Sequence, residues 1–259
     1  MTTTSHALGR DPLPIRGIVV AVPARDEQAT VKRCLQAISR AADRVPDHVR
    51  VFVVLACDSC HDRTAEIASN LVTRDRRIEV LSGWWASAGE ARASAVRLGM
   101  RRALERGVTF RELWIATTDA DTIVPADWLT RQLAYASDGA DAVAGLVDLL
   151  HDDDETEAVR LVFDAGYVRA DGHAHVHGAN LGARADAYDA VGGFPPVRLA
   201  EDHALWNALR RAGFNCVSSG ALVVATSARL RGRAHGGFAD LLRDRLHLPP
   251  RNPLAIGFF

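Results

Sequence analysis

Short apolar runs alternate with amphipathic stretches along the first half of the chain. Four runs have the length and composition of buried strands, at residues 17–22, 49–56, 78–82 and 112–117. Helical periodicity separates them: Val31, Leu35 and Ile38 recur on one face, and a second helix is predicted over 88–106, ending at Gly107. Apolar strands that alternate with helices form right-handed βαβ units on a mostly parallel sheet. The pattern therefore predicts an α/β fold.

The second half of the chain has a looser pattern. Strands are predicted over 141–149, 172–178 and 215–226, and helices over 127–136 and 201–212. A length of 259 residues is enough for one large α/β core or two small ones, and the sequence shows no internal repeat. We expect a flexible leader over 1–15, a regular half over 16–125 and a looser half over 126–259 of the same domain.

Charge and composition narrow the possible partners. The formal net charge of −1 gives no electrostatic basis for binding nucleic acid or an acidic membrane surface. No apolar stretch reaches the ~20 residues needed to cross a bilayer, and the leader lacks the apolar core of an export signal. Four cysteines do not make a disulfide framework in a chain of this length. We therefore expect a cytoplasmic protein without a transmembrane segment.

Two carboxylates, Asp119 and Asp121, flank Ala120 just after the apolar run that ends at Thr117. Ligands of open α/β sheets collect at the carboxyl ends of the strands, where these acids are expected. Hard oxygen donors in this place suit Mg²⁺ or Mn²⁺, which leaves coordination positions open for phosphate oxygens. A polar strand-to-helix loop is the alternative, because Asp is common in turns and helix caps.

Other segments carry polar side chains to expected strand ends and helix starts. They are VVAVPARDE from Val19, VVLACDSCHDRT from Val53, GEARASAVRLG from Gly89, HGANLGARADAYDAVGGF from His177 and the acidic pair Glu201-Asp202. The ordered series resembles the family 2 glycosyltransferases of GT-A fold, over roughly residues 18–233. The resemblance implies a single GT-A (Rossmann-like) domain with a mostly parallel central sheet flanked by helices. It makes 16–125 the nucleotide-sugar-binding half, and 126–259 the acceptor-binding half with a C-terminal lid or helix.

The resemblance also implies roles for individual residues. Donor-binding positions are Pro23, Ala24, Arg25, Glu27, Asp58, Arg92, Asp119, Ala120 and Asp121, of which Asp119 and Asp121 hold Mn²⁺ or Mg²⁺. Acceptor-binding positions are His177, Gly178, Asn180, Gly193 and Phe194. Asp202 is the expected general base, and Glu201 orients the base or the acceptor. The alternative for this pair is structural, because acids in a first helical turn complement the helix dipole.

Cys57 and Cys60 form a C-x-x-C motif where the family usually has an acid and a serine. Redox chemistry or half of a zinc site is one interpretation, but no second Cys or His pair has the spacing to complete a tetrahedral site. Asp58, Asp62 and Thr64 match the family pattern. Asp58 is therefore the predicted nucleobase contact, and Asp62 is predicted to cap the next helix.

Histidine and arginine cluster at two further places. His173, His175 and His177 alternate, which puts them on one face of the predicted strand 172–178, either as a polar face of a cleft or as a metal site. The segment from Thr226 brings together Arg229, Arg231, Arg233 and His235. This segment is either a surface basic patch or a lid that closes over a diphosphate, with His235 as a further metal ligand.

Together these features predict a metal-dependent glycosyltransferase that moves a hexosyl group from a UDP- or GDP-linked sugar to an acceptor hydroxyl, with inversion. A sugar nucleotidyltransferase is the alternative enzyme class, although PARDEQAT lacks the glycine-rich basic loop that normally opens such a chain. A non-catalytic protein that binds nucleotide sugars is the other alternative.

Overall fold

The computed structural model describes residues 13–85, 87–150, 156–229 and 246. The described chain forms two compact units. The first takes in the residues up to Asp148 and those from Val168 to Thr226, and it holds nearly all of the elements discussed below. The second takes in the residues from Leu149 to Tyr167 and those from Ser227 onward. Its helix α5 (Thr156–Asp164) is tied to Leu149 by a hydrogen bond from Arg160 Nη2 to the Leu149 carbonyl, at 2.9 Å.

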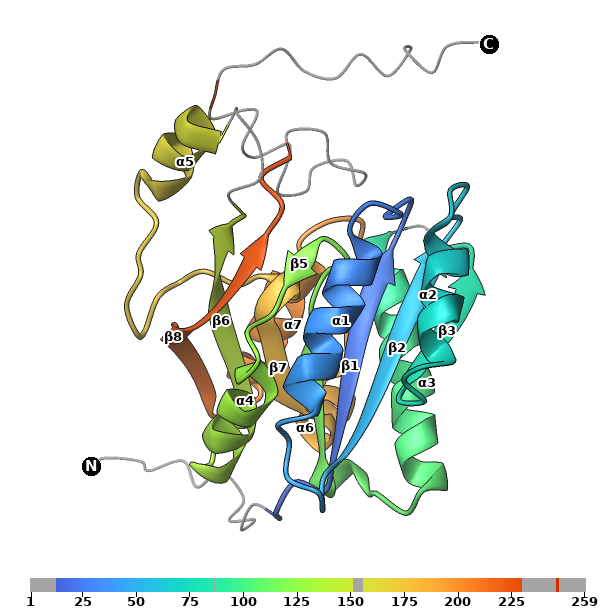
Figure 1. The fold of residues 1–259 in the computed structure, drawn as a ribbon. Helices are drawn as coiled ribbons and strands as arrows, with labels where there is room; N and C mark the ends of the chain where they lie inside the picture. Colours follow the sequence, from blue (N-terminus) through green and yellow to red (C-terminus); the bar gives the residue numbers. More distant parts are fainter. Residues whose placement is uncertain (1–12, 86, 151–155, 230–245, 247–259) are drawn as a thin grey trace, which may run out of the picture. The chain divides into compact units, whose positions relative to one another are not determined.

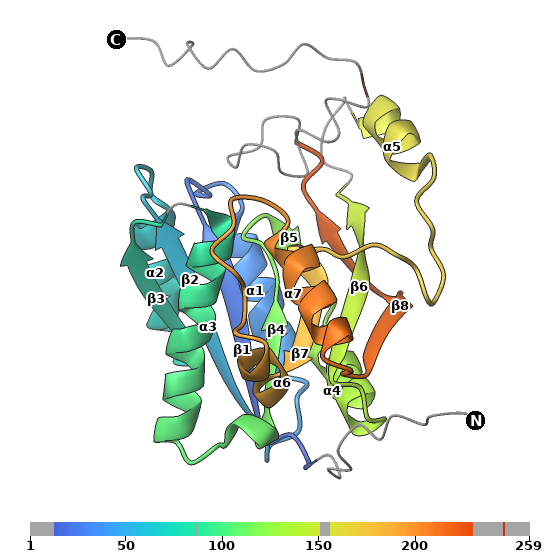
Figure 2. The same cartoon turned by 180° about the vertical axis from the view of Figure 1, so that it is seen from behind.

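The predicted βαβ pattern of the first half is confirmed. The elements in order are β1 (Gly17–Ala24), α1 (Val31–Ala42), β2 (Arg50–Asp58), α2 (Thr64–Val72), β3 (Ile78–Gly83), α3 (Ala88–Glu105), the 3-10 helix η1 (Phe110–Glu112) and β4 (Leu113–Thr117). Parallel pairing joins the strands in the order β3-β2-β1-β4. Figures 1 and 2 show α1 and α2 on one face of these strands and α3 on the other.

One boundary in β1 differs from the prediction. The strand continues through Pro23 to Ala24, whereas the sequence predicts that it stops before the proline. Pairing with β4 ends at Ala21, so Pro23 has a ladder partner on only one side of the strand. A missing N–H is tolerated at such a position.

The second half of the chain completes the sheet with antiparallel pairs. Its elements are β5 (Thr122–Ile123), α4 (Trp128–Ser137), β6 (Ala142–Leu149), the 3-10 helix η2 (Gly178–Asn180), β7 (Leu181–Arg184), α6 (Ala185–Ala190), α7 (Glu201–Arg211) and β8 (Cys216–Thr226). β7 pairs antiparallel with both β4 and β6, and β5 pairs antiparallel with β8. The eight strands lie in the order β3-β2-β1-β4-β7-β6-β8-β5. The predicted α/β class with a flanked central sheet is confirmed.

The strand predicted over 172–178 is wrong. No strand forms there; Gly172 adopts a φ of 78°, and the 3-10 helix η2 begins at Gly178. The alternation that predicted a strand is nevertheless visible in the packing. The rings of His173 and His175 stack with centroids 5.7 Å apart, and those of His175 and His177 at 6.1 Å. The three histidine rings therefore stack in a row here without a strand.

Close packing of α3 on the sheet positions its first turns at the site. Gly99 faces β1 so tightly that a Cβ added there would lie 2.4 Å from Val19 Cγ1. Only glycine lets the helix approach to this distance. Ser87 caps the helix by accepting a hydrogen bond from the Glu90 amide at 3.2 Å. The cap and the contact at Gly99 together place Arg92 near the carboxyl ends of the parallel strands. Within the described chain, no helix is both long enough and apolar enough to cross a bilayer.

Candidate active site

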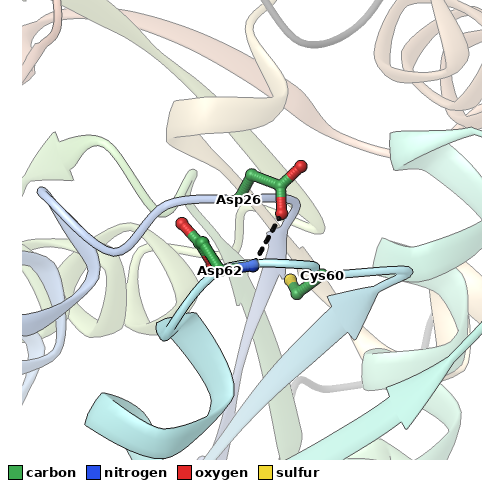
Figure 3. Close-up of side chains that lie close together, drawn as sticks. All are labelled: Asp26, Cys60 and Asp62. Carbon is green, nitrogen blue, oxygen red and sulfur yellow. Dashed lines mark hydrogen bonds between the residues drawn. The ribbon is translucent and has the colours of Figure 1, made fainter. Parts of the chain in front are cut away.

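Two loops that follow β1 and β2 are joined by hydrogen bonds between side chains and backbone. Asp26 Oδ1 accepts hydrogen bonds from the amides of His61, at 2.7 Å, and Asp62, at 3.3 Å. Asp62 Oδ2 accepts from the Gln28 amide at 2.9 Å, and Cys60 Sγ donates to the Ala24 carbonyl at 3.4 Å. Figure 3 shows Asp26, Cys60 and Asp62 close together where the loops meet. The two loops therefore act as one support for the carboxyl edge of the sheet.

Asp62 and Glu27 organise the helices that leave these loops. Asp62 Oδ1 accepts a hydrogen bond from the Thr64 amide at 2.9 Å, although the N-cap of α2 is Arg63, so Asp62 binds the first turn from one position before the predicted cap. The buried Glu27 accepts from the Thr30 hydroxyl at 2.8 Å, and its carbonyl accepts from the amide of Val31. The Glu27 side chain thus supports the start of α1 from inside the protein.

Asp58, the predicted nucleobase contact, lies at the end of β2 beside a cleft. Its buried carboxylate accepts a hydrogen bond from the Trp85 amide at 2.8 Å, and Arg25 Nη1 lies 3.8 Å from Asp58 Oδ2. The neighbouring cleft has a volume of about 210 Å³ and is lined by Cys57, Ser59, Cys60, Ala65, Ser82, Gly83 and Trp84. Trp84 is 91% exposed at this cleft. The sequence reasoning missed this residue, although the WW dipeptide after the third predicted strand was a visible signal.

Asp119 and Asp121 follow β4, as predicted. Asp119 Oδ1 accepts a hydrogen bond from Arg92 Nη2 at 2.6 Å, while its side chain stays 37% exposed. Asp121 Oδ1 lies 3.4 Å from the Thr226 hydroxyl, at the end of β8, and Ala120 between the two acids is buried. Both acids are thus at the carboxyl edge of the sheet.

Arg92 joins the D-x-D motif to the acidic pair of α7. Its guanidinium donates to Asp119 from Nη2 and to Glu201 Oε1 from Nη1. It lies 5.6 Å from the centre of the Phe194 ring, and its side chain is only 3% exposed. Burial disfavours the charge, but Asp119, Glu201 and Asp202 together raise the pKa of Arg92 above its ordinary value. The cation is therefore fixed between the two groups of acids.

Asp202 is held by backbone amides. Its Oδ2 accepts a hydrogen bond from the Gly178 amide at 2.8 Å, and its Oδ1 accepts from its neighbour His203 at 2.7 Å. Gly178 in turn packs on Arg92, since a Cβ there would lie 2.7 Å from the guanidinium carbon. Glycine at 178 is thus required by this contact, and Asp202 and Arg92 meet through it.

The predicted acceptor residues fall into two groups. Phe194 lies against Arg92, and Gly193, with a φ of 71°, brings the Phe194 amide to the Tyr188 hydroxyl at 3.0 Å. Burial, with help from the neighbouring histidines, lowers the pKa of His177 to about 3, so its ring is neutral. Asn180, in contrast, lies in the protein interior.

The Asn180 side chain is completely buried and bonded within the protein. Its Oδ1 accepts a hydrogen bond from Trp128 Nε1 at 2.9 Å, and its Nδ2 donates to the carbonyls of Leu146, at 2.8 Å, and Leu222, at 2.9 Å. These three bonds use both hydrogens of the amide nitrogen and one acceptor position of its oxygen. The side chain therefore holds α4, β6 and β8 together and is not presented to an acceptor.

The carboxylates of the D-x-D motif fit a hard divalent cation as oxygen donors at a partly exposed edge. Asp119 has one oxygen bonded to Arg92, so its second oxygen is the one left to a metal. A closer cluster of Asp26, Cys60 and Asp62 also exists among the described residues. Its Asp26 and Asp62 oxygens already accept hydrogen bonds from backbone amides. Arg229 is half-buried, whereas Arg231, Arg233 and His235 lie outside the described residues.

Comparisons with known proteins agree with this geometry. Residues 19–191 match the family model described as glycosyl transferase family 2. A search of curated proteins finds no match for the chain. Among solved structures, the chain is similar to the mannosyltransferase PcManGT from Pyrobaculum calidifontis in complex with GDP-Man and Mn²⁺, with a TM-score of 0.59 and 17% identity over 93% of this chain and 63% of that one.

Two other solved structures show the same fold at low identity. S. aureus TarS 1-349 in complex with UDP-GlcNAc has a TM-score of 0.58 and 13% identity, over 86% of this chain and 62% of that one. GalNAc-T7 with UDP, GalNAc and Mn²⁺ has a TM-score of 0.61 and 11% identity, over 84% of this chain and 44% of that one. The chain thus spans less than two thirds of the length of each of these structures.

Proposed function

The chain belongs to glycosyl transferase family 2, and from this premise we propose that it transfers a hexosyl group from a nucleoside diphosphate sugar to an acceptor hydroxyl, with inversion. The observation that carries the proposal is the position of Arg92 between Asp119 and Glu201. Asp119 follows β4 and Glu201 begins α7, so these acids come from distant segments of the chain, and one buried cation brings them to one site. A donor group and an acceptor group of residues at one edge are what glycosyl transfer requires.

The donor is proposed to lie along the carboxyl ends of β1, β2 and β4. Asp58 would contact the nucleobase, with Arg25 and the backbone of Pro23 and Ala24 beside it. PcManGT was solved with GDP-Man and TarS with UDP-GlcNAc, which supports a GDP- or UDP-linked hexose for this chain.

Asp121 and the second oxygen of Asp119 would hold the divalent cation, Mn²⁺ or Mg²⁺. When bound, such a cation neutralises the charge of the leaving diphosphate. Two of the similar structures contain Mn²⁺, which favours that ion. Arg92 orients Asp119 through the salt bridge at 2.6 Å.

Asp202 is the proposed general base, which takes the proton from the acceptor hydroxyl as it attacks the anomeric carbon. The amides of Gly178 and His203 orient its carboxylate. Glu201 is a positioning residue, because its side chain is only 13% exposed and bound to Arg92. His177, Gly178, Gly193 and Phe194 would form the acceptor side of the site.

Thermal shift measurements with UDP and GDP, with and without Mn²⁺, test the donor side. Ligands that bind the native state raise the melting temperature by mass action. We expect a shift with one nucleotide that disappears in EDTA. An equal shift in EDTA would remove the metal from the proposal. In a separate assay, release of pyrophosphate from a nucleoside triphosphate and a sugar phosphate would favour a nucleotidyltransferase.

Asp202→Asn tests the chemistry. Loss of a positioned proton acceptor should lower turnover by about 10²-fold or more, with nucleotide affinity nearly unchanged. Asp186→Asn is the matched control, because Asp186 is also a first-turn acid whose carboxylate accepts a backbone amide. The control should keep normal turnover. An Asp202→Asn variant that keeps most of its activity at saturating acceptor would refute the base assignment.

A further inference from the structure

Cys57 and Cys60 lie side by side at the end of β2. Cys57 is the next-to-last residue of the strand, and the chain then turns through Ser59, which has a left-handed φ of 48°. This turn brings the Cys57 and Cys60 thiols close enough to interact, and both residues line one cleft. The two sulfurs therefore face the same space in the folded chain.

The two thiols have different access to solvent. Cys57 is 2% exposed, whereas Cys60 is half-buried and stands where the loops after β1 and β2 meet (Figure 3). Both residues line the cleft of about 210 Å³ that also contains Trp84. A small molecule in the cleft can therefore reach Cys60, with Cys57 behind it.

Their chemical environments also differ. The hydrogen bond from Cys57 lowers the pKa of Cys60 to about 7, with help from the Asp26 amide and against burial and the Asp26 and Asp62 carboxylates. The same pairing raises the pKa of Cys57. Cys60 is thus partly ionised at neutral pH, where its thiolate coexists with the thiol that donates to the Ala24 carbonyl, and Cys57 is the thiol that can attack second. Thiolates are the reactive form in disulfide exchange.

The other two cysteines lack these features. Cys34 is completely buried, and burial raises the pKa of its thiol. Cys216 is partly exposed, but burial raises its pKa to about 11. Cys216 is a control of the same residue type, because it has no cysteine partner among the described residues.

We propose that Cys57 and Cys60 are a thiol-modification site that reacts with small-molecule disulfides, and that the intramolecular disulfide formed there weakens nucleotide binding at the adjacent edge of the sheet. The second part rests on the proposed function, because it takes Asp58 and Arg25 as donor contacts. A cytosolic disulfide of this kind is transient and responds to the redox state.

The reaction proceeds by two exchanges. The Cys60 thiolate attacks a disulfide RSSR, which forms a Cys60–SR mixed disulfide and releases RS⁻. Cys57 then loses its proton to solvent, attacks Cys60 Sγ and displaces the second RS⁻. The two RS⁻ ions take up two protons from solvent, which replace the one that Cys60 lost on ionising and the one that Cys57 lost. Two protein thiols are oxidised to one disulfide, and RSSR is reduced to two RSH.

Oxidation reaches the donor site through contacts that the thiols make. Once it is in a disulfide, Cys60 has no hydrogen to donate to the Ala24 carbonyl, so the bond at 3.4 Å between the two loops is lost. Asp58 lies between the two cysteines in sequence, and it holds the Trp85 amide and faces Arg25. A covalent link across Asp58 therefore moves the residues that the donor would contact.

The experiment incubates the full chain in buffers of increasing glutathione disulfide to glutathione ratio. Peptide mapping locates the disulfide, and calorimetry measures affinity for UDP and GDP with Mn²⁺ before and after treatment with dithiothreitol. We expect a Cys57–Cys60 disulfide and a loss of nucleotide affinity of about tenfold or more, as when an interaction between positioned polar groups is lost, with full recovery on reduction.

Single variants separate the two exchanges. Cys57→Ser removes the resolving thiol, so Cys60 should accumulate as its mixed disulfide with glutathione. Cys60→Ser should form no disulfide and keep its affinity in oxidising buffer, because a serine hydroxyl can still donate to the Ala24 carbonyl. Cys216→Ser should behave as the unchanged protein.

Three outcomes would overturn all or part of this proposal. If no Cys57–Cys60 disulfide forms at any ratio, and Cys57→Ser traps no mixed disulfide, the site does not exist. If the disulfide forms and nucleotide affinity stays the same, the link to donor binding is wrong. If the reduced protein binds neither nucleotide, the proposed function fails, and with it the link to donor binding, while the mapped disulfide still decides whether the thiol site exists.

Discussion

Replacement of Arg92 by methionine removes the cation that joins the D-x-D motif to the acidic pair of α7. Methionine preserves most of the side-chain volume and the contact with Phe194, but leaves two carboxylates without their partner. Breaking a buried ion pair by removing one member costs about 3–5 kcal/mol. The Asp119 side chain is 37% exposed, so water can hydrate its carboxylate once Arg92 is gone. The Glu201 side chain is only 13% exposed, so its carboxylate is hydrated less well.

The expected loss is therefore at the lower end of that range, about 3 kcal/mol, with Glu201 as the main source. With a urea slope of about 3 kcal/mol/M, the unfolding midpoint should fall by about 1 M. Urea unfolding followed by circular dichroism measures this change. Glu201→Gln in the Arg92→Met background should recover part of the loss, because it removes the carboxylate that lost its partner.

Arg102→Met is the matched control. Arg102 lies on the same helix and also pairs with two acids, Glu79 at 2.8 Å and Glu105 at 3.0 Å, but at the protein surface. Exposed pairs contribute little to stability, so its midpoint should stay close to that of the unchanged protein. Equal midpoints for Arg92→Met and Arg102→Met would refute the argument that burial makes Arg92 important. If Glu201→Gln does not reduce the loss of stability in Arg92→Met, that loss comes from altered packing and not from the unpaired carboxylate.

Two other predictions concern the metal and pH. Asp121→Asn should weaken nucleotide binding in Mn²⁺ and reduce turnover together, because Asp121 would hold a cation that neutralises diphosphate charge in both binding and transfer. Calorimetry with and without EDTA checks this, and an unchanged metal effect would contradict the assignment. His177 has a pKa of about 3 in the folded chain, so below its ordinary value of about 6.5 only the unfolded chain takes up the proton, and stability falls as pH falls. His177 should account for a loss of about 2 kcal/mol in the free energy of unfolding between pH 7 and pH 5. Urea unfolding at both pH values should show that this loss is absent in His177→Gln and kept in the control His48→Gln, which changes a surface histidine. A steep pH dependence that persists in His177→Gln would refute the role of His177.

The regular half of the fold was predictable because its signals are local. Buried parallel strands are continuous apolar runs, as in GIVVAVPA, and each is followed by a helix with an apolar face. Pairing of parallel strands then brings their carboxyl ends to one edge without further information. For this reason the placement of Asp58 and Asp119 at strand ends was predictable from their positions in the sequence alone.

The second half was less predictable because alternation does not specify what covers a segment. Residues 172–178 alternate like a strand but stack their histidine rings without a pairing partner. Asn180 belonged to a motif expected to face an acceptor. Its burial depends on Trp128, Leu146 and Leu222, which lie on three elements that only the tertiary fold brings together.

By itself, the sequence determined the order of strands and helices, the family resemblance and the identity of the chemical groups at the strand ends. Only the tertiary structure decided their partners. Arg92 and Glu201 are separated by 109 positions in the chain, and no periodicity relates them. Their contact forms because α3 and α7 pack where the parallel strands end, and because Gly89 leaves room for the Glu201 side chain. Local sequence sets backbone conformation through nearest neighbours, whereas ion pairs between distant segments depend on packing of the whole sheet.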